Sequence, residues 1–206
     1  MSIKTHSNQW SKVYDHNENM TRDIDYKATV EVLDNYDFKK VIELGCGTGK
    51  KTKWLVDKAD IIYGLDFSEK MLEVARKKIL SNKVKFIQTD ILQPWPIGER
   101  EFDLVTSSLT LEHIKDLNNI FNKAYSFLKT SGLFFISELH PFKQYTGSKA
   151  KFENNNKTTE LKTFTHNISD FLNSGKETGF KLINLREWFD EKEKYLPRLI
   201  TFIFQK

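Results

Sequence analysis

The chain has 206 residues, of which 39% are hydrophobic and 29% charged, and its 32 basic and 28 acidic side chains give a formal net charge of +4. This length suffices for a single domain with a full hydrophobic core, and the composition excludes a disordered or membrane-spanning chain. A single cysteine, Cys46, excludes an intramolecular disulfide and a cysteine-based zinc site. Because no apolar leader follows Met1, we expect a cytoplasmic protein.

Short β-rich runs alternate with helical patterns along the chain, and this alternation is typical of a parallel α/β sheet. The strands that we predict are 40–44, 61–65, 84–89, 102–107, 133–138, 180–185 and 199–204. Apolar residues spaced three and four apart predict helices over 50–59, 68–80 and 117–128. Ser68 is the expected N-cap of the second helix, and Gly132 and Gly179 are expected to end helices with a positive φ.

Two segments do not fit this alternation, although we expect the whole chain, 1–206, to form one domain. Residues 1–36 are predicted to form an N-terminal helical cap, with a helix from about Asp23. Residues 141–165 are polar and irregular, and they follow the fifth strand on the side where open α/β sheets bind ligands. We interpret this segment as a substrate lid, with a mobile surface loop as the alternative.

A glycine-rich turn follows the first predicted strand, in the run Val41-Ile-Glu-Leu-Gly-Cys-Gly-Thr-Gly49. Gly45, Gly47 and Gly49 let the backbone turn sharply and approach a ligand that a side chain would exclude. The third glycine comes one position too early for the pyrophosphate-binding motif of dinucleotide sites. We therefore expect a ligand without phosphates, whose ammonium and sulfonium groups meet backbone carbonyls and a carboxylate.

Acidic residues end the next two predicted strands. Asp66 follows the glycine turn by roughly 20 residues, where a carboxylate can accept both hydroxyl groups of a ribose. Asp90 is placed to bind the amino group of an adenine, with Ile91 against the ring. Each acid alone is better explained as a helix cap or a solvated turn residue, but together with the turn they predict one binding site.

Residues 40–138 closely resemble the class I S-adenosylmethionine-dependent methyltransferases. Residues 43–49, Glu-Leu-Gly-Cys-Gly-Thr-Gly, match the first motif of that family nearly letter for letter, and residues 102–109 resemble its fourth-strand motif. The resemblance implies a Rossmann-like α/β fold: a seven-stranded, mostly parallel sheet with a C-terminal antiparallel hairpin and helices on both faces. It also implies S-adenosylmethionine as the cofactor and S-adenosylhomocysteine as the product.

The resemblance assigns roles to residues at the strand ends. It implies that Glu43 orders the glycine turn or reaches the donor's ammonium group, that Asp66 binds the ribose and that Asp90 binds the adenine edge. Cys46 is expected to serve as a small residue of the turn, because no adjacent base would activate it as a nucleophile. The residues implied to bind the cofactor are Glu43, Gly45, Cys46, Gly47, Asp66, Phe67, Met71, Asp90, Ile91 and Ser107.

The expected reaction is a direct displacement, in which an acceptor lone pair attacks the sulfonium methyl group in line. His140 and His166 are the candidate catalytic bases, because an imidazole pKa near ~6.5 suits proton transfer. A structural hydrogen-bonding role is an equal alternative for both. A metal site of these two histidines with Glu138 matches no short motif, so we predict no metal. The residues predicted to contact the substrate are Tyr14, Leu109 and His113, with a packing or positional role as the alternative for Tyr14 and His113.

The organisation of the chain resembles the small-molecule branch near the quinone-biosynthesis methyltransferases, so we expect a small-molecule acceptor for O, N or C transfer. Family members that methylate base amino groups carry an Asn/Asp-Pro-Pro-Tyr motif where this chain has Ser107-Ser-Leu-Thr110. The scattered lysines also argue against a nucleic-acid partner. Alternatives that stay open are an RNA or protein acceptor, a non-catalytic S-adenosylmethionine-binding protein and, less favoured, a nicotinamide-dependent oxidoreductase. Monomer and homodimer are both open.

Overall fold

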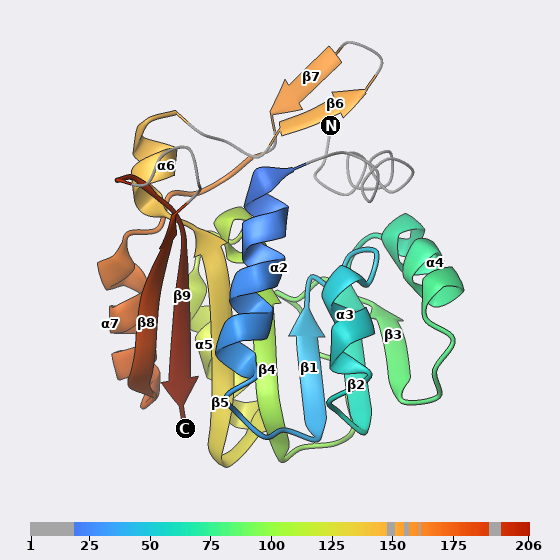
Figure 1. Cartoon of the computed structure of the whole chain (residues 1–206). Helices are drawn as coiled ribbons and strands as arrows, with labels where there is room; N and C mark the ends of the chain where they lie inside the picture. The colour runs from blue at the N-terminus through green and yellow to red at the C-terminus, as the bar shows by residue number, and fades with distance from the viewer. Residues whose placement is uncertain (1–18, 148–150, 155–156, 161, 190–194) are drawn as a thin grey trace.

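The computed structural model describes residues 19–147, 151–154, 157–160, 162–189 and 195–206. Its centre is a seven-stranded sheet with the strand order β3-β2-β1-β4-β5-β9-β8 (Figure 1). The pairs from β3 to β5 are parallel, whereas β9 runs antiparallel to both β5 and β8, as predicted. The strands are β1 (Lys40–Leu44), β2 (Ile61–Asp66), β3 (Val84–Gln88), β4 (Phe102–Ser108), β5 (Leu128–Leu139), β8 (Lys181–Phe189) and β9 (Pro197–Gln205).

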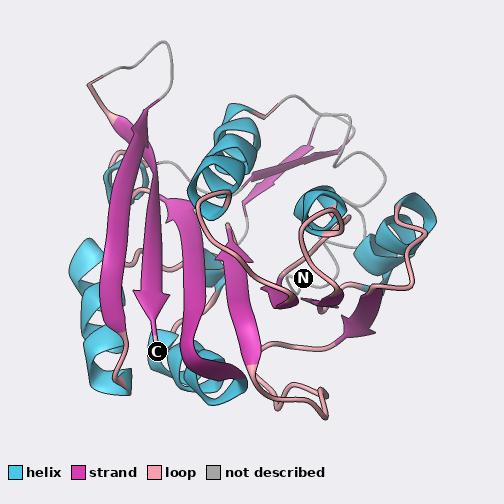
Figure 2. Ribbon diagram, turned by 60° about the horizontal axis from the view of Figure 1, so that its bottom comes forward, coloured by secondary structure: helices cyan, strands magenta, loops and turns pink. Residues whose placement is uncertain are grey.

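Helices cover both faces of this sheet (Figure 2). They are α2 (Met20–Leu33), α3 (Lys50–Leu55), α4 (Glu69–Lys78), α5 (Leu117–Phe127), α6 (Pro141–Tyr145) and α7 (Ile168–Thr178), with the 3-10 turn η1 (Leu111–His113). Side chains of α2 and α3 share one core with one face of the sheet, and side chains of α5 and α7 share a second core with the other face. Successive residues of a strand point to opposite faces, so the fully buried neighbours Phe134 and Phe135 belong to different cores.

The two predicted helix-ending glycines have different outcomes. Gly179 ends α7 with φ +99° in the left-handed region, which confirms the prediction. The prediction for Gly132 is wrong: this residue lies within β5, and the positive φ belongs to Ser131. A Cβ atom on Gly132 would lie 2.9 Å from the carbonyl oxygens of Lys129 and Phe102. Close approach of the backbone therefore requires this glycine.

The segment 141–165 differs from the irregular loop that we expected. It begins with α6, for which His140 is the N-cap and Pro141 the first residue, a favoured position for proline. It continues with β6 (Lys151–Asn154) and β7 (Lys157–Glu160), which pair as a separate two-stranded sheet. The N-terminal cap is described from Asn19 onward, and α2 begins three residues before the expected start. Ser68 caps α4 as predicted, accepting the N–H of Met71.

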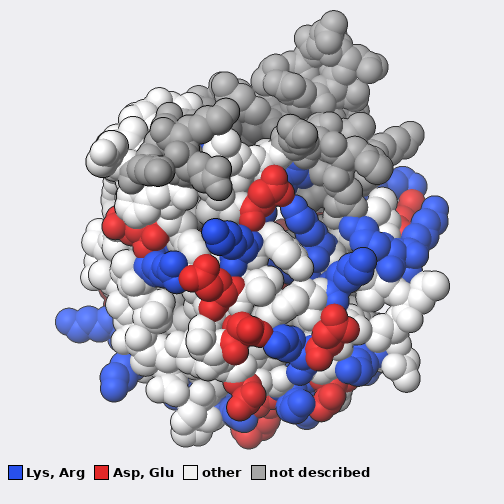
Figure 3. Space-filling view, viewed as in Figure 1, with Lys and Arg blue, Asp and Glu red and all other residues white. Residues whose placement is uncertain are grey.

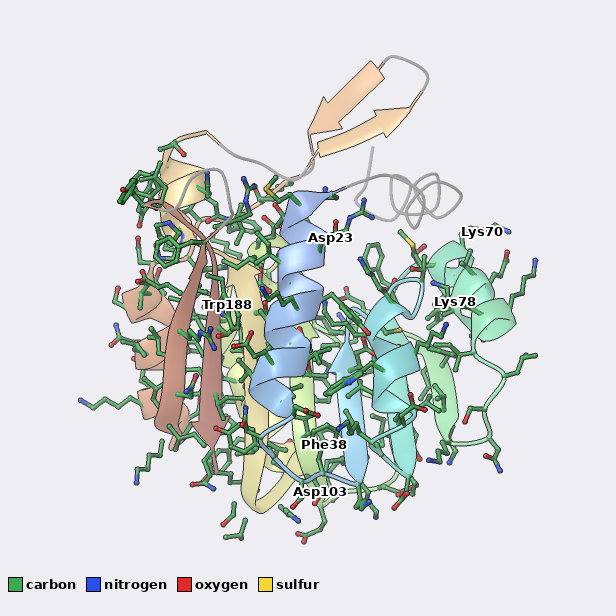
Figure 4. The ribbon with its side chains drawn as sticks, in the orientation of Figure 1. Asp23, Phe38, Lys70, Lys78, Asp103 and Trp188 are labelled. Carbon is green, nitrogen blue, oxygen red and sulfur yellow. The ribbon has the colours of Figure 1, made fainter. Side chains whose placement is uncertain are left out.

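The two ends of the sheet have different characters. Asp103, labelled at the lower end in Figure 4, accepts the backbone N–H groups of Lys39 and Lys40 at 2.9 and 2.7 Å and pairs with Lys129. At this end of the sheet, where β1 begins, hydrogen bonds to backbone N–H groups and an ion pair therefore hold the strands β1, β4 and β5 together. The glycine turn lies at the other end, because it follows the carboxyl end of β1. The parallel strands therefore direct the candidate site to that end of the sheet.

Candidate functional site

A small cleft of about 50 Å³ lies at the carboxyl ends of β1 and β4, against α2. Helix α2 contributes Arg22, Asp25 and Tyr26 to its lining, and the start of α3 contributes Lys50 and Lys51. The lining also includes the turn residues 45–48, Glu43 of β1, and Ser108 and Leu109 at the end of β4. The cleft thus gathers three segments that lie far apart in the sequence.

The glycine turn forms one wall of this cleft through backbone conformations that favour glycine. Gly45, Gly47 and Gly49 have φ values of +66°, +53° and +76°. A Cβ atom on Gly45 would lie 2.2 Å from Oγ1 of Thr110, so the Thr110 side chain occupies the space that a larger residue would need. A Cβ atom on Gly47 would meet no described residue within 4 Å, so this glycine faces open space in the part of the chain that the structure describes. The turn therefore offers exposed backbone to a ligand at Gly47.

Asp66, at the carboxyl end of β2, is bonded directly to this turn. Its Oδ2 accepts the N–H of Gly47 at 2.9 Å, and its Oδ1 accepts the N–H of Ser68 at 2.8 Å. Asp66 is 6% exposed, and this burial raises the pKa of its carboxyl group to about 6, against the effect of the two N–H bonds. A carboxylate has about four acceptor sites, so capacity for ligand hydroxyl groups remains after these two bonds.

The residues predicted to surround an adenine lie along the neighbouring strand ends. Met71 and Ile91 are buried, Phe67 is half-buried, and Asp90 is exposed with its Oδ1 accepting the N–H of Leu92. Sequence reasoning missed Lys123 of α5, whose ammonium group donates to the carbonyl oxygens of residues 91, 92 and 93 at 2.9, 2.5 and 2.8 Å. Lys123 therefore fixes the loop that follows Asp90, a role that depends on a tertiary contact.

Glu43 connects the two sides of the glycine turn. Its Oε2 accepts the hydroxyl of Thr52 in α3 at 2.5 Å, so β1 and α3 are tied together across the turn. Burial raises the pKa of the Glu43 carboxyl group to about 7, and the Thr52 bond and the charge of Lys51 oppose this rise. The resemblance implied that Glu43 either orders the glycine turn or binds the donor's ammonium group. The bond to Thr52 supports the first of these roles.

Glu138, at the end of β5, holds the backbone that follows β4. Its Oε1 accepts the N–H groups of Thr110 and Leu111 at 2.9 and 2.7 Å, at the start of η1. Glu138 is 2% exposed, and burial together with the nearby Glu112 raises the pKa of its carboxyl group to about 8. Thr110 is the residue packed on Gly45. Glu138 thus positions a contact of the glycine turn.

The structure does not bring the two candidate catalytic histidines into one pocket. Nε2 of His140 lies 3.0 Å from Oε1 of Glu187 in β8, and its Nδ1 accepts the N–H of Phe142. Nε2 of His166 lies 2.7 Å from the carbonyl oxygen of Ile114, and this residue lines a separate hollow of about 300 Å³ beside α5 and α7. The catalytic role of both residues stays a prediction.

The predicted substrate contacts are spread over different parts of the site. Leu109 lines the cleft with φ +49°, and His113 lies in η1 with its Nδ1 3.1 Å from the carbonyl oxygen of Lys162. Ser107 is buried beside the cleft residue Ser108, and Tyr14 lies outside the described residues. Within the described part of the chain, no group of three His, Cys, Asp or Glu side chains is arranged to hold a metal ion. None of the helices described there is long and apolar enough to cross a membrane.

Comparison with known sequences gives one matching family, described as "Methyltransferase domain", over residues 42–136. A demethylmenaquinone methyltransferase of Thermotoga maritima is 33% identical over 130 residues, which are 61% of this chain and 56% of that protein. A ubiquinone biosynthesis O-methyltransferase of Vibrio campbellii is 31% identical over 113 residues, 54% of this chain and 48% of that protein. The chain spans about half the length of these relatives.

Solved structures share the fold over nearly the whole chain. An S-adenosylmethionine-dependent methyltransferase from Mesorhizobium loti has a TM-score of 0.75 at 20% identity, covering 89% of this chain and 98% of that one. Another, from Clostridium acetobutylicum, has a TM-score of 0.72 at 20% identity, covering 98% and 97%. At this level of identity, the likeness shows that the α/β sheet and its helices have the same fold.

Proposed function

We propose that the chain is a class I S-adenosylmethionine-dependent methyltransferase that transfers a methyl group from S-adenosylmethionine to a small-molecule acceptor; the match of residues 42–136 to a methyltransferase domain supports this proposal. The observation that carries this proposal is the glycine turn that is bonded through Gly47 to the buried carboxylate of Asp66. The turn offers backbone to a ligand, and the carboxylate at the next strand end offers acceptors for ribose hydroxyl groups.

The residues at the strand ends fit this donor. Among the described residues, nothing fills the space beside the backbone of Gly47, and the buried side chains of Met71 and Ile91 offer apolar contact to an adenine. In the proposed site, the turn would hold the methionine part, Asp66 the ribose, and Asp90 with Ile91 the base. When bound, the donor supplies a methyl group on a positively charged sulfonium that is already activated for displacement. The protein's task is then to align the acceptor with that methyl group.

The residues around η1 would perform this alignment. Glu138 fixes the backbone of Thr110 and Leu111, and this places Thr110 against Gly45 of the donor turn. Leu109 lines the same cleft and would contact the acceptor. His140 and His166 remain proposed bases. Nδ1 of His140 already accepts the N–H of Phe142, so His140 would have to give up this bond before Nδ1 could take a proton. His166 donates through Nε2 to the carbonyl oxygen of Ile114 and would take a proton at Nδ1.

A small-molecule acceptor is supported by the relatives and by the surface. The ubiquinone and demethylmenaquinone methyltransferases among the relatives are named for quinone biosynthesis. Over the lower part of the face in Figure 3, basic and acidic side chains are interspersed, which is typical of a solvated surface. The segment 141–165 remains our proposed substrate lid.

Calorimetric titration with S-adenosylhomocysteine, run beside NADH, tests the donor. We expect micromolar binding of S-adenosylhomocysteine alone. Asp66→Asn should weaken this binding about 10- to 100-fold, because the ribose hydroxyl groups lose a charged acceptor worth about 1.5–3 kcal/mol. Asp34→Asn, on the exposed pair with Lys58, should leave it unchanged. Binding of NADH alone, or of neither ligand, would contradict the proposal. A screen of methyl acceptors then tests the transfer.

A further inference from the structure

Asp25 of α2 is a buried acid in the lining of the cleft, and its two oxygens differ. The residue is 2% exposed, and its Oδ2 lies 2.5 Å from Nζ of Lys51 in α3. Its Oδ1 is buried and has no hydrogen-bond partner among the described residues. A buried charged oxygen without a partner is costly. The lining of the donor cleft therefore contains an acceptor that a ligand can satisfy.

Two buried hydroxyl groups lie on the same side of the sheet as Asp25. Ser108 and Ser137 are register partners in β4 and β5. Alternation along β5 places Ser137 on the face of Phe135, which belongs to the core shared with α2. The Oγ atoms of Ser108 and Ser137 also have no hydrogen-bond partner among the described residues. On the face of the sheet that α2 covers, the carboxyl ends of β4 and β5 therefore carry polar side chains, whereas the middle of these strands carries apolar ones.

The unpartnered oxygens of this region suit a ligand that carries hydrogen-bond donors, in a cleft that is lined by Arg22, Lys50 and Lys51 as well as by the acids. Glu43 lines the same cleft, and its pKa is raised mainly by burial and to a smaller extent by the charges of Asp66 and Asp25. Lys51 neutralises Asp25 from the α3 side. An ammonium group has three donors and no acceptor, so it suits the Asp25 oxygen and a neighbouring hydroxyl. The cleft, at about 50 Å³, has room for such a small charged group and not for a nucleoside.

We propose that Asp25 binds the ammonium group of the donor's amino-acid end through its Oδ1, with the hydroxyl of Ser108 beside it, while Lys51 stays paired with Oδ2. The inference rests on the proposed function. It makes α2 part of the donor site, and it assigns the ammonium to a side chain of the N-terminal helix. Glu43 then keeps the structural bond to Thr52.

Two ligands that differ in one group test this proposal by calorimetry. S-adenosylhomocysteine carries the ammonium group, and 5′-S-(3-carboxypropyl)-5′-thioadenosine lacks it but keeps the carboxylate. Wild-type protein should bind the second ligand about 10- to 100-fold more weakly, as expected for the loss of a charged hydrogen bond. Asp25→Asn should weaken binding of S-adenosylhomocysteine by a similar factor and leave binding of the carboxypropyl ligand within twofold.

Asp23→Asn is the matched control, because Asp23 lies on the same helix (Figure 4), is exposed and pairs with Lys50. It should change neither affinity. Equal effects of Asp25→Asn on both ligands would overturn the inference and assign Asp25 to support of a group that both ligands share. No effect on either would also overturn it and would assign the Asp25 oxygen to a buried water. Equal binding of the two ligands by wild-type protein would overturn it even if the variant does not fold. Failure of wild-type protein to bind S-adenosylhomocysteine would instead contradict the proposed function.

Discussion

Three acids, Glu43, Asp66 and Glu138, lie at the carboxyl ends of three strands and are each at most 6% exposed. Burial raises the pKa of their carboxyl groups to about 7, 6 and 8 respectively. An acid whose pKa is raised by folding holds its proton more tightly in the folded state than in the unfolded one. Its contribution to stability is therefore complete below the unfolded-state pKa and is lost as the pH rises through the folded-state value.

Glu138 has the highest of these pKa values, so its substitution should change how stability depends on pH. Glu138→Gln keeps one oxygen for the N–H groups of Thr110 and Leu111 but cannot take a proton. Relative to this variant, the wild-type free energy of unfolding should fall by up to about 1.4 kcal/mol per pH unit from about pH 5 to 8. Urea denaturation across this range measures the difference.

The matched control is Glu73→Gln, because Glu73 is exposed on α4 and its bond to Lys70 lowers the pKa of its carboxyl group. This variant should follow the wild-type pH profile between about pH 5 and 8. A constant difference between wild type and Glu138→Gln would show that Glu138 keeps one protonation state through this range.

At the scale of elements, α7 approaches the sheet closely because it has a glycine in its contact face. A Cβ atom on Gly175 would lie 2.6 Å from Cε1 of Phe204 in β9. Phe204 is 1% exposed and packs edge to face against Phe121 of α5, with ring centroids 5.3 Å apart. Well-packed cores resist added atoms. The position of α7 over the β8–β9 hairpin therefore depends on the small size of residue 175.

Gly175→Ala should destabilise the protein although alanine favours a helix. Overpacking costs about 1–3 kcal/mol, and the gain in helix propensity returns up to about 1 kcal/mol. Gly98→Ala is the control, because a Cβ atom there would meet none of the described residues within 4 Å, and it should change stability by less than about 0.5 kcal/mol. Urea denaturation compares the two. Equal stability of both variants would mean that Phe204 yields to the added methyl group.

Sequence patterns predicted the elements that carry their own signal, and they missed those that depend on distant partners. The alternation of buried strands and amphipathic helices predicted the parallel α/β sheet, and the family resemblance implied its antiparallel C-terminal hairpin. The glycine turn and Asp66 followed from local motifs. The hairpin of β6 and β7 was missed because its residues are polar. Asp25 and Lys123 were missed because their roles arise from tertiary contacts. Asp25 pairs with Lys51, 26 residues further along the chain. Lys123 donates to carbonyl oxygens that lie 30 to 32 residues before it.

At the scale of the whole molecule, α2 connects the candidate site to the C-terminal hairpin. Asp23 and Asp25 pair with Lys50 and Lys51 of α3, at the donor turn. Further along α2, Glu31 pairs with Arg186 of β8 at 2.7 Å. Exposed pairs of this kind contribute little to stability, but the buried Asp25 pair fixes which part of α2 faces the cleft. Donor binding should therefore change the protection of a helix that lies outside the glycine turn.

Hydrogen exchange measured with and without S-adenosylhomocysteine tests this coupling. At a ligand concentration 100 times Kd, amides that exchange only after ligand release should slow by up to about 100-fold. We expect this slowing in residues 45–49 and in the first half of α2, and no change in residues 128–132, the start of β5 at the opposite end of the sheet. Asp25→Asn at equal saturation should keep the slowing in residues 45–49 and lose it in α2. Unchanged exchange of α2 in the wild-type protein would place this helix outside the donor site.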